Sequence, residues 1–141
     1  MKKTVIILSA LLFIMQGCTN AQNNNDKNKE KAKVIVYYFH GTHRCPGCLA
    51  SEDVAFKSTK ELYPEQVKQG VIKCESVNFE EKDNKALAEK YQVAWSTLLI
   101  VKQFNGKEEK TDLTSDAFSY ARSSPEKLKE LIKTTVDKML K

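Results

Sequence analysis

The feature that most constrains this chain is a continuous apolar segment, Val34 to His40, which a four-residue polar loop joins to a Cys-x-x-Cys motif. An apolar run of this length bounded by a polar loop predicts a strand that is buried on both faces. Pro46 follows the first cysteine, and proline is favoured at the first helical position because the helix does not need its amide there. The segment therefore predicts a strand, a loop and a helix that starts at Cys45.

The position of the two cysteines at the start of this helix predicts a reactive thiol pair. The positive end of the helix dipole favours the thiolate of Cys45, and we expect the neighbouring Arg44 and His43 to lower its pKa further. Cys48 lies three residues on, on the same helical face, where it can attack a mixed disulfide formed at Cys45. A structural disulfide is the alternative, but so small a loop removes little entropy from the unfolded chain. For His43, a solvated loop position is the alternative.

The N-terminal third of the chain is not built like a domain. An apolar run from Val5 to Met15 follows two lysines, is too short to span a bilayer, and has the layout of a secretory signal. It ends at Cys18, which resembles a bacterial lipoprotein signal whose cysteine carries the lipid. Cleavage after Ala21 is the alternative. We expect residues 1–17 to be a lipoprotein signal peptide and residues 18–33, which are almost devoid of apolar side chains, to be a flexible tether.

Charge and cysteine content fit an exported protein. Removal of residues 1–17 takes away two lysines and no acidic residue, so the formal net charge falls from +5 to +3. No basic block with interleaved aromatic residues is present, and we expect no nucleic-acid partner. The expected location is the bacterial cell envelope, lipid-anchored to a membrane and facing the periplasm or exterior. Cys74 is left over, and we expect an inert core thiol, with a third redox or metal ligand as the alternative.

From residue 34 onward, strand and helix patterns alternate. Strands are expected at residues 34–40, 71–79, 97–104 and 107–113, and helices from the cysteine motif to Leu62, from Asp83 or Asn84 to Tyr91, and from Pro125 onward. Asn105 and Gly106 predict a tight hairpin between the last two strands. Residues 114–123 are expected to form a polar loop in which Phe118 and Tyr120 pack onto the body. The predicted order is β-α-β-α-β-β-α, an α/β fold in one domain over residues 34–141.

On these residues the chain resembles the thioredoxin-like fold. The likeness covers about Val34 to Lys141 and rests on the cysteine pair, residues 91–93, residues 97–100 and residues 105–107. More narrowly, residues 36–45 and 118–122 are similar to ArsF-type thioredoxin-like proteins, which are labelled as a subunit of a nitrophenyl-compound nitroreductase. That resemblance implies an electron carrier that supplies reductant to a partner enzyme or a metalloid system. The chain has no glycine-rich phosphate loop that could bind a flavin.

One departure from the thioredoxin pattern lies before the third strand. Thioredoxins have a cis-proline there, facing the cysteines, whereas this chain has Ser96. Because a cis bond without proline is costly, we expect the Trp95–Ser96 bond to be trans. The resemblance makes Trp95, Ser96 and Thr97 the expected substrate-binding residues. A core position is the alternative for Trp95.

A second departure lies on the strand before the cysteines. By spacing, Phe39 stands where thioredoxins bury a carboxylate beneath the resolving cysteine. The proton of Cys48 is therefore expected to pass to His40, His43 or water, although a structural role is the first expectation for His40.

Together these features predict an envelope thiol-disulfide oxidoreductase or electron carrier. We expect it to need no cofactor beyond its redox-active disulfide, to act as a monomer on thiol or disulfide proteins, and to exchange electrons with a membrane redox partner. Copper or zinc binding by His43, Cys45 and Cys48, with Cys74 as fourth ligand, is the alternative. Haem attachment is excluded because Leu49, not histidine, follows Cys48. A module that only binds another protein would leave the thiol pair unexplained.

Overall fold

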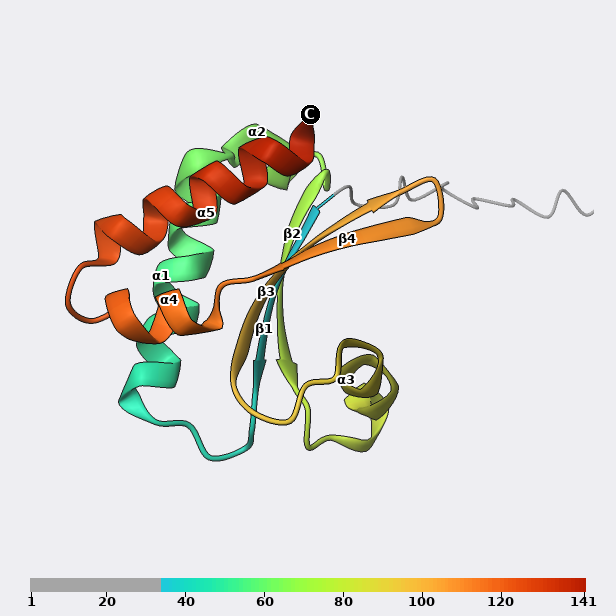
Figure 1. The fold of residues 1–141 in the computed structure, drawn as a ribbon, viewed down its shortest axis with the longest axis vertical. Coiled ribbons are helices and arrows are strands. Elements are labelled where there is room, and N and C mark those ends of the chain that lie inside the picture. The colour runs from blue at the N-terminus through green and yellow to red at the C-terminus, as the bar shows by residue number, and fades with distance from the viewer. Residues whose placement is uncertain (1–33) are drawn as a thin grey trace, which may run out of the picture.

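The computed structural model describes residues 34–141, in which four strands form one mixed sheet with the order β2-β1-β3-β4 (Figure 1). The strands are β1 (Val34–His40), β2 (Ile72–Asn78), β3 (Thr97–Phe104) and β4 (Lys107–Asp112). β1 pairs in parallel with β2 and antiparallel with β3, and β4 pairs antiparallel with β3. Parallel strands need a crossover connection, which the helix after the cysteine motif supplies.

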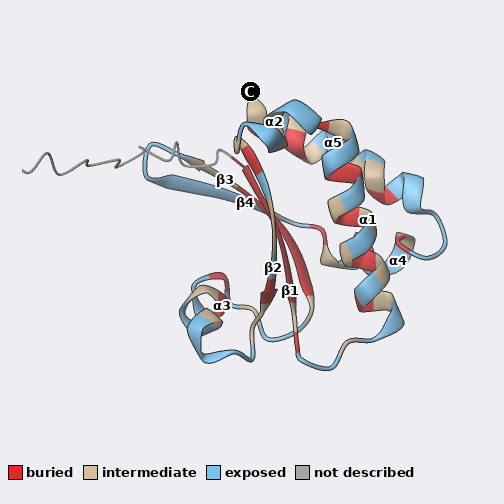
Figure 2. Ribbon diagram, turned by 180° about the vertical axis from the view of Figure 1, so that it is seen from behind, coloured by how far each residue is buried: buried red, intermediate tan, exposed pale blue. Residues whose placement is uncertain are grey.

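Helices cover both faces of the sheet. The helices are α1 (Pro46–Leu62), α2 (Pro64–Lys68), α3 (Lys85–Tyr91), α4 (Thr114–Tyr120) and α5 (Pro125–Leu140), with a short 3₁₀ turn, η1 (Lys82–Asn84), before α3. Figure 1 and Figure 2 show α1, α4 and α5 together on one side of the sheet and α3 on the other. The two layers differ in size because one short helix covers the second face.

The apolar run of β1 separates two hydrophobic cores. Alternate residues Val34, Val36 and Tyr38 pack against α1 and α5, while Ile35, Tyr37 and Phe39 pack on the face that α3 covers. All six are buried, as Figure 2 shows for the central strands. Full burial of one such side chain stabilises the fold by roughly 1.5–3 kcal/mol, so β1 is firmly anchored. The predicted strand buried on both faces is confirmed.

Other local predictions are also confirmed. Asn105 and Gly106 have φ values of 50° and 73°, as the predicted hairpin turn requires. In α5 the buried residues are Leu128, Ile132, Val136 and Met139, which are spaced along one helical face as predicted. β2 is one residue shorter than predicted at each end. β4 is one residue shorter than predicted at its C-terminal end.

The structure corrects the polar loop predicted for residues 114–123. Residues 114–120 form α4, whose Ala117 is fully buried against the core. The side chain of Asp112 accepts a hydrogen bond from the Thr114 amide at 2.8 Å, which holds the chain where the helix begins. Two aromatic residues were predicted to pack onto the body. Tyr120 lies against the core as predicted, but Phe118 is 44% exposed, so the prediction for Phe118 was wrong.

Strand order and helix placement together are those of the thioredoxin-like fold. The predicted β-α-β-α-β-β-α framework is present as β1-α1-β2-α3-β3-β4-α5, and α2 and α4 are additions that sequence patterns did not predict. Among residues 34–141 no helix is long and apolar enough to cross a membrane. The predicted signal peptide, the Cys18 lipid site and the tether lie outside the described residues.

Candidate redox site

The cysteine motif lies where three elements meet. β1 ends at His40, α1 begins at Pro46, and the pairing of Phe39 with Thr97 places the start of β3 beside the end of β1. Figure 1 shows this meeting point at the end of the central strands, where the β1–α1 loop turns. The sheet thus holds two separate segments of chain, the cysteine loop and the residues before β3, against each other.

Cys45 and Cys48 form a disulfide, and Cys45 occupies the N-cap of α1. Their Cα atoms are 5.1 Å apart, within the usual range for a disulfide. The backbone of Cys45 is extended, Pro46 takes the first helical position, and Cys45 Sγ accepts a hydrogen bond from the Cys48 amide at 3.1 Å. The predicted strand, loop and helix start are confirmed.

The two sulfurs differ in their access to solvent. Cys45 is exposed, whereas Cys48 is only 8% exposed and belongs to the buried face of α1. A helix amide and the helix dipole both act on Cys45 Sγ, and both stabilise negative charge on sulfur once the disulfide is reduced. Of the two sulfurs, that of Cys45 is therefore the one that a partner molecule can reach.

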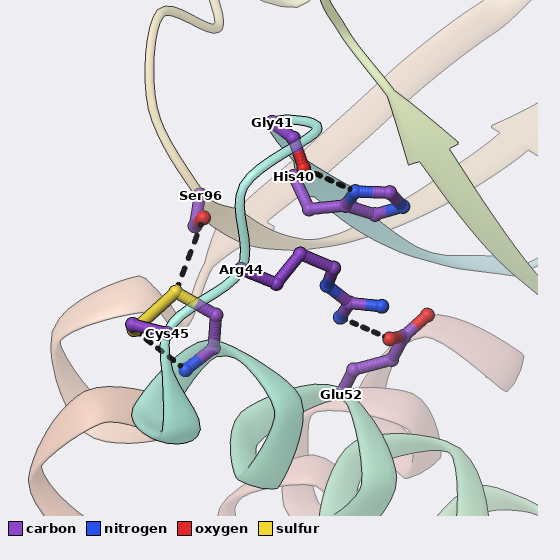
Figure 3. Close-up of a disulfide and its surroundings, with 7 residues drawn as sticks. His40, Gly41, Arg44, Cys45, Glu52 and Ser96 are labelled. Atoms are coloured by element: carbon purple, nitrogen blue, oxygen red, sulfur yellow. Dashed lines mark hydrogen bonds and ion pairs between the residues drawn. A yellow bond between two sulfur atoms is a disulfide. The ribbon is translucent and has the colours of Figure 1, made fainter.

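Arg44 points away from the sulfurs. Figure 3 shows its side chain running from the loop toward α1, where it forms an ion pair with Glu52. Its guanidinium carbon also lies 5.7 Å from the centre of the Tyr38 ring. Glu52 balances the charge of Arg44. The lowering of the Cys45 pKa by Arg44 remains a prediction.

The two histidines of this region also face other groups. His43 is exposed, and its charge adds to the hydrogen bonds from Thr42 that lower the pKa of Glu80. The ring of His40 lies 2.9 Å from Gly41 O and 3.1 Å from Ser76 Oγ, and Figure 3 shows it directed away from the disulfide. The structural role expected for His40 agrees with these contacts, and a proton path from Cys48 to His40 does not.

Ser96 is the β3-side residue that faces the disulfide. Its Oγ donates a hydrogen bond to Cys48 Sγ at 3.6 Å, which Figure 3 shows as the contact across the loop. No cis peptide bond occurs within residues 34–141, so the Trp95–Ser96 bond is trans, as expected. Trp95 is 67% exposed, and its alternative as a core residue is therefore wrong. Thr97 is buried, with its hydroxyl donated to Trp95 O at 2.9 Å.

Three exposed apolar residues lie close in the chain or in space to the motif and to Ser96. Leu49, Trp95 and Phe118 are each about half exposed or more, and they adjoin Cys48, Ser96 and Gly47 respectively. A Cβ placed on Gly47 would lie 3.7 Å from the Phe118 ring, so Phe118 is a direct neighbour of the motif. Trp95 and Thr97 also line a pocket of about 180 Å³ with Tyr91 and Lys110. The sequence patterns missed Phe118 because it lies on a helix mistaken for a loop.

Tyr38 is the last buried residue of β1 on the side of the sheet that α1 and α5 cover. Phe39, the residue at the thioredoxin acid position by spacing, faces the opposite core. Burial raises the pKa of Tyr38, and nearby Ser51, Arg44 and Ser96 partly oppose this effect. Three buried polar atoms have no hydrogen-bond partner: Tyr38 Oη, Ser51 Oγ and Arg44 Nε. Sequence spacing did not reveal this polar cluster.

Cys74 is remote from the pair. Its neighbours Thr59 and Lys60 act on its pKa, which burial raises above the usual value. Thr59 is fourteen residues beyond Cys45 along α1, about 20 Å at the rise of a helix. Cys74 therefore cannot be a fourth ligand with Cys45, and its alternative as a third member of the site is wrong. Within the described part of the chain, no group of three or more His, Cys, Asp and Glu side chains is arranged to hold a metal.

Comparisons with known proteins find one distant likeness. No protein-family model and no curated protein matches the chain. Among solved structures, the chain is similar to the crystal structure of Trxlp from Edwardsiella tarda EIB202, with 18% identity over 75% of this chain and 87% of that chain, and a TM-score of 0.43. The thioredoxin-like fold of this chain is shown by its own strand order, and its Cys-x-x-Cys pair at disulfide distance fits a thiol-disulfide redox role.

Proposed function

We propose that the protein is a thiol-disulfide oxidoreductase that moves electrons to or from other proteins through Cys45 and Cys48. The observation that supports this proposal is the asymmetry of the pair. An exposed sulfur at a helix N-cap is a nucleophile, and a second, buried sulfur three residues on is a resolving thiol. A purely structural disulfide needs neither the helix N-cap nor this difference in access.

The reduced pair reacts in two exchange steps. The Cys45 thiolate attacks one sulfur of a substrate disulfide, that S–S bond breaks, and the leaving thiolate takes a proton from solvent. Cys48 then loses its proton and attacks Cys45 Sγ, which breaks the mixed disulfide and releases the second substrate thiol. Two electrons have passed to the substrate, and the Cys45–Cys48 disulfide must be reduced again by a partner. The reverse sequence oxidises a dithiol.

The surface around Cys45 favours a polypeptide substrate. The exposed side chain of Phe118 lies beside Gly47 and offers apolar contact at the motif, and the exposed residues Leu49 and Trp95 adjoin Cys48 and Ser96 in the chain. The proposed substrate-binding residues are Trp95, Ser96 and Thr97. Ser96 would bind the substrate through its backbone and through its hydroxyl, which lies beside Cys48 Sγ.

We further propose that the chain acts as a lipid-anchored envelope protein, monomeric, with a membrane redox partner. This proposal draws on the lipoprotein-like sequence that ends at Cys18 and on the polar residues 19–33. The ArsF-type resemblance favours an electron carrier that supplies reductant to a partner enzyme. Mass spectrometry of the membrane-extracted protein is expected to show an acylated Cys18, and an unmodified Cys18 would contradict the anchor.

Trapping of mixed disulfides tests the oxidoreductase proposal. A Cys48→Ser variant is expected to accumulate covalent adducts on Cys45 that appear on a non-reducing gel and vanish with reductant, because no thiol remains to resolve them. The matched control is Cys45→Ser, which is expected to trap little because Cys48, the thiol of the pair that remains, is buried. Equal and negligible adducts in both variants would contradict the proposal.

A further inference from the structure

The two sulfurs of the disulfide accept hydrogen bonds from different parts of the chain. Cys45 Sγ accepts one from the Cys48 amide at 3.1 Å, within the first turn of α1. Cys48 Sγ accepts one from the Ser96 hydroxyl at 3.6 Å, which comes from the segment before β3 (Figure 3). Within residues 34–141 no other hydrogen bond reaches Cys48 Sγ. The buried sulfur therefore depends on a side chain outside its own helix.

The segment that carries Ser96 is held in place by β3. Thr97 is buried at the start of this strand, pairs with Phe39 of β1, and donates its hydroxyl to Trp95 O at 2.9 Å. That hydrogen bond joins the residues on either side of Ser96, which is itself half-buried. The Ser96 hydroxyl is thus already placed at Cys48, and little reorganisation is needed when its hydrogen bond becomes stronger.

This hydrogen bond matters most when Cys48 is a thiolate. A neutral sulfur is a weak acceptor, whereas a charged acceptor makes a hydrogen bond roughly twice as strong. Cys48 is only 8% exposed, so water solvates its thiolate poorly and burial alone disfavours the negative charge. A hydroxyl fixed beside the sulfur replaces part of the lost solvation. Ser96 therefore acts on the state of Cys48 that attacks a disulfide.

The charged groups of the surroundings are paired or directed elsewhere. Arg44, from the loop, points away from the sulfurs and forms an ion pair with Glu52 of α1 (Figure 3). His43, from the same loop, is exposed to solvent. On β1, Tyr38 stays neutral because burial raises the pKa of its phenol. From α4, the uncharged ring of Phe118 lies beside the motif. The Ser96 hydroxyl is thus the group whose effect on Cys48 the contacts support.

We propose that Ser96 is a catalytic residue whose hydroxyl stabilises the Cys48 thiolate during resolution of the mixed disulfide. This inference rests on the proposed function, because only an exchange reaction requires Cys48 to become a thiolate. The Cys48 thiol gives its proton to water, and the Ser96 hydroxyl donates its hydrogen bond to the thiolate and keeps its own proton. The thiolate attacks Cys45 Sγ, the bond between Cys45 and the substrate sulfur breaks, and that sulfur leaves with the electron pair.

A single-turnover reaction with an aromatic disulfide reagent isolates the resolution step. The full chain is used with Cys18 and Cys74 replaced by serine, so that the pair supplies the only thiols. The reduced protein releases one coloured thiolate when Cys45 attacks the reagent and a second when Cys48 resolves the adduct. Both rates are read in one experiment and measured over a series of pH values.

Ser96→Ala is expected to slow the second release by about threefold to tenfold near neutral pH and to leave the first unchanged. Loss of one charge-assisted hydrogen bond is expected to raise the midpoint of the pH profile of the second release by about one to two pH units. The more basic thiolate is also the stronger nucleophile, which offsets part of the loss of rate. Above both midpoints, Ser96→Ala is therefore expected to resolve at least as fast as the wild type. Ser96→Thr retains a hydroxyl and is expected to keep the wild-type midpoint.

The pH profile separates the hydroxyl from packing. Ser76→Ala, the matched control, removes a hydroxyl that contacts His40 near the same loop and is expected to release both thiolates at the wild-type rates. A wild-type midpoint in Ser96→Ala, or a loss of rate that is the same at every pH, would overturn the role of the hydroxyl. A midpoint in Ser96→Thr as high as that in Ser96→Ala would overturn it too.

The wild-type protein separates this inference from the proposed function. Release of both thiolates by the wild type supports the exchange reaction whatever the Ser96 variants show. A wild-type protein that releases only the first thiolate would overturn the proposed function and the role of Ser96 with it.

Discussion

Cys45, Cys48 and Cys74 carry the same thiol group in three different environments. Cys45 is exposed at a helix N-cap, Cys48 is buried behind it against Ser96, and Cys74 is half-buried in the middle of β2. Thiolate chemistry follows solvent access and local charge, so the three are expected to react at different rates. The reactive residue is set by its position in the fold.

Cys74 provides a prediction on this scale. In a variant with Cys45 and Cys48 both replaced by serine, we expect alkylation of Cys74 near neutral pH to be about tenfold slower than that of Cys45 in a Cys48→Ser, Cys74→Ser variant. Burial raises the pKa of Cys74, so its thiolate fraction is smaller, and its sulfur is less accessible. Alkylation followed by mass spectrometry measures both rates, with denaturant restoring the rate of Cys74 as control. Equal rates in the folded proteins would contradict this assignment.

Individual side chains also join the helices to one another. Tyr63 follows α1, and its buried hydroxyl lies 2.7 Å from Asp137 Oδ1 and 3.1 Å from Lys133 O on α5. Burial and the bond to Asp137 raise the pKa of Tyr63 well above its usual value. This contact fixes the end of α1 against α5, and the start of α1 carries the cysteine pair.

Tyr63→Phe tests this helix contact. We expect the unfolding free energy to fall by about 1 kcal/mol near neutral pH, the net value of a typical hydrogen bond. An unfolded tyrosine ionises near pH about 10 whereas folded Tyr63 stays neutral, so its contribution is fully present below that pH and is lost as pH rises toward the folded pKa. The variant should therefore show a shallower alkaline loss of stability than the wild type in urea unfolding at several pH values.

Tyr120→Phe, on α4, is the matched control because its hydroxyl is not part of this contact. It is expected to unfold like the wild type at neutral pH. If Tyr63→Phe and Tyr120→Phe were equally stable and showed the same alkaline decline, the hydroxyl of Tyr63 would not join α1 to α5.

At the scale of the whole molecule, burial on both faces of β1 explains the position of the site. A strand held by two cores ends at a fixed point, and the cysteine loop and the start of β3 meet there. The short polar segments at this end of the sheet carry the cysteine pair and its neighbours on a rigid scaffold, as is common for functional loops. The thioredoxin-like topology places the pair, and side chains particular to this chain set its surroundings.

The sequence predicts those parts of the fold that depend on strong local patterns. β1 is visible because burial on both faces leaves an uninterrupted apolar run, the hairpin because Asn105 and Gly106 tolerate positive φ, and α5 because its apolar residues share one face. α4 was missed because its seven residues bury only one of them, Ala117, too few for a periodic pattern.

The surroundings of the sulfurs depend on contacts that spacing does not reveal. Phe39 was placed beneath Cys48 by counting back from Cys45, but Phe39 belongs to the core on the α3 side of the sheet and Tyr38 to the core on the α1 side. Arg44 precedes the helix, so its pairing with Glu52, eight residues on, follows no helical interval. The position of the cysteine pair was therefore predictable from the motif, whereas the side chains around it were not.

The equilibrium of the Cys45–Cys48 pair in buffers of graded redox potential tests the central claim most directly. We expect a single two-electron transition between dithiol and disulfide, measured by alkylation and mass spectrometry, at a potential within the span of about −270 to −120 mV that redox-active pairs of this kind occupy. Cys74→Ser is the background in which to measure it, so that the remaining thiol does not interfere. A pair that stays oxidised below about −300 mV would be a structural disulfide and would contradict the account.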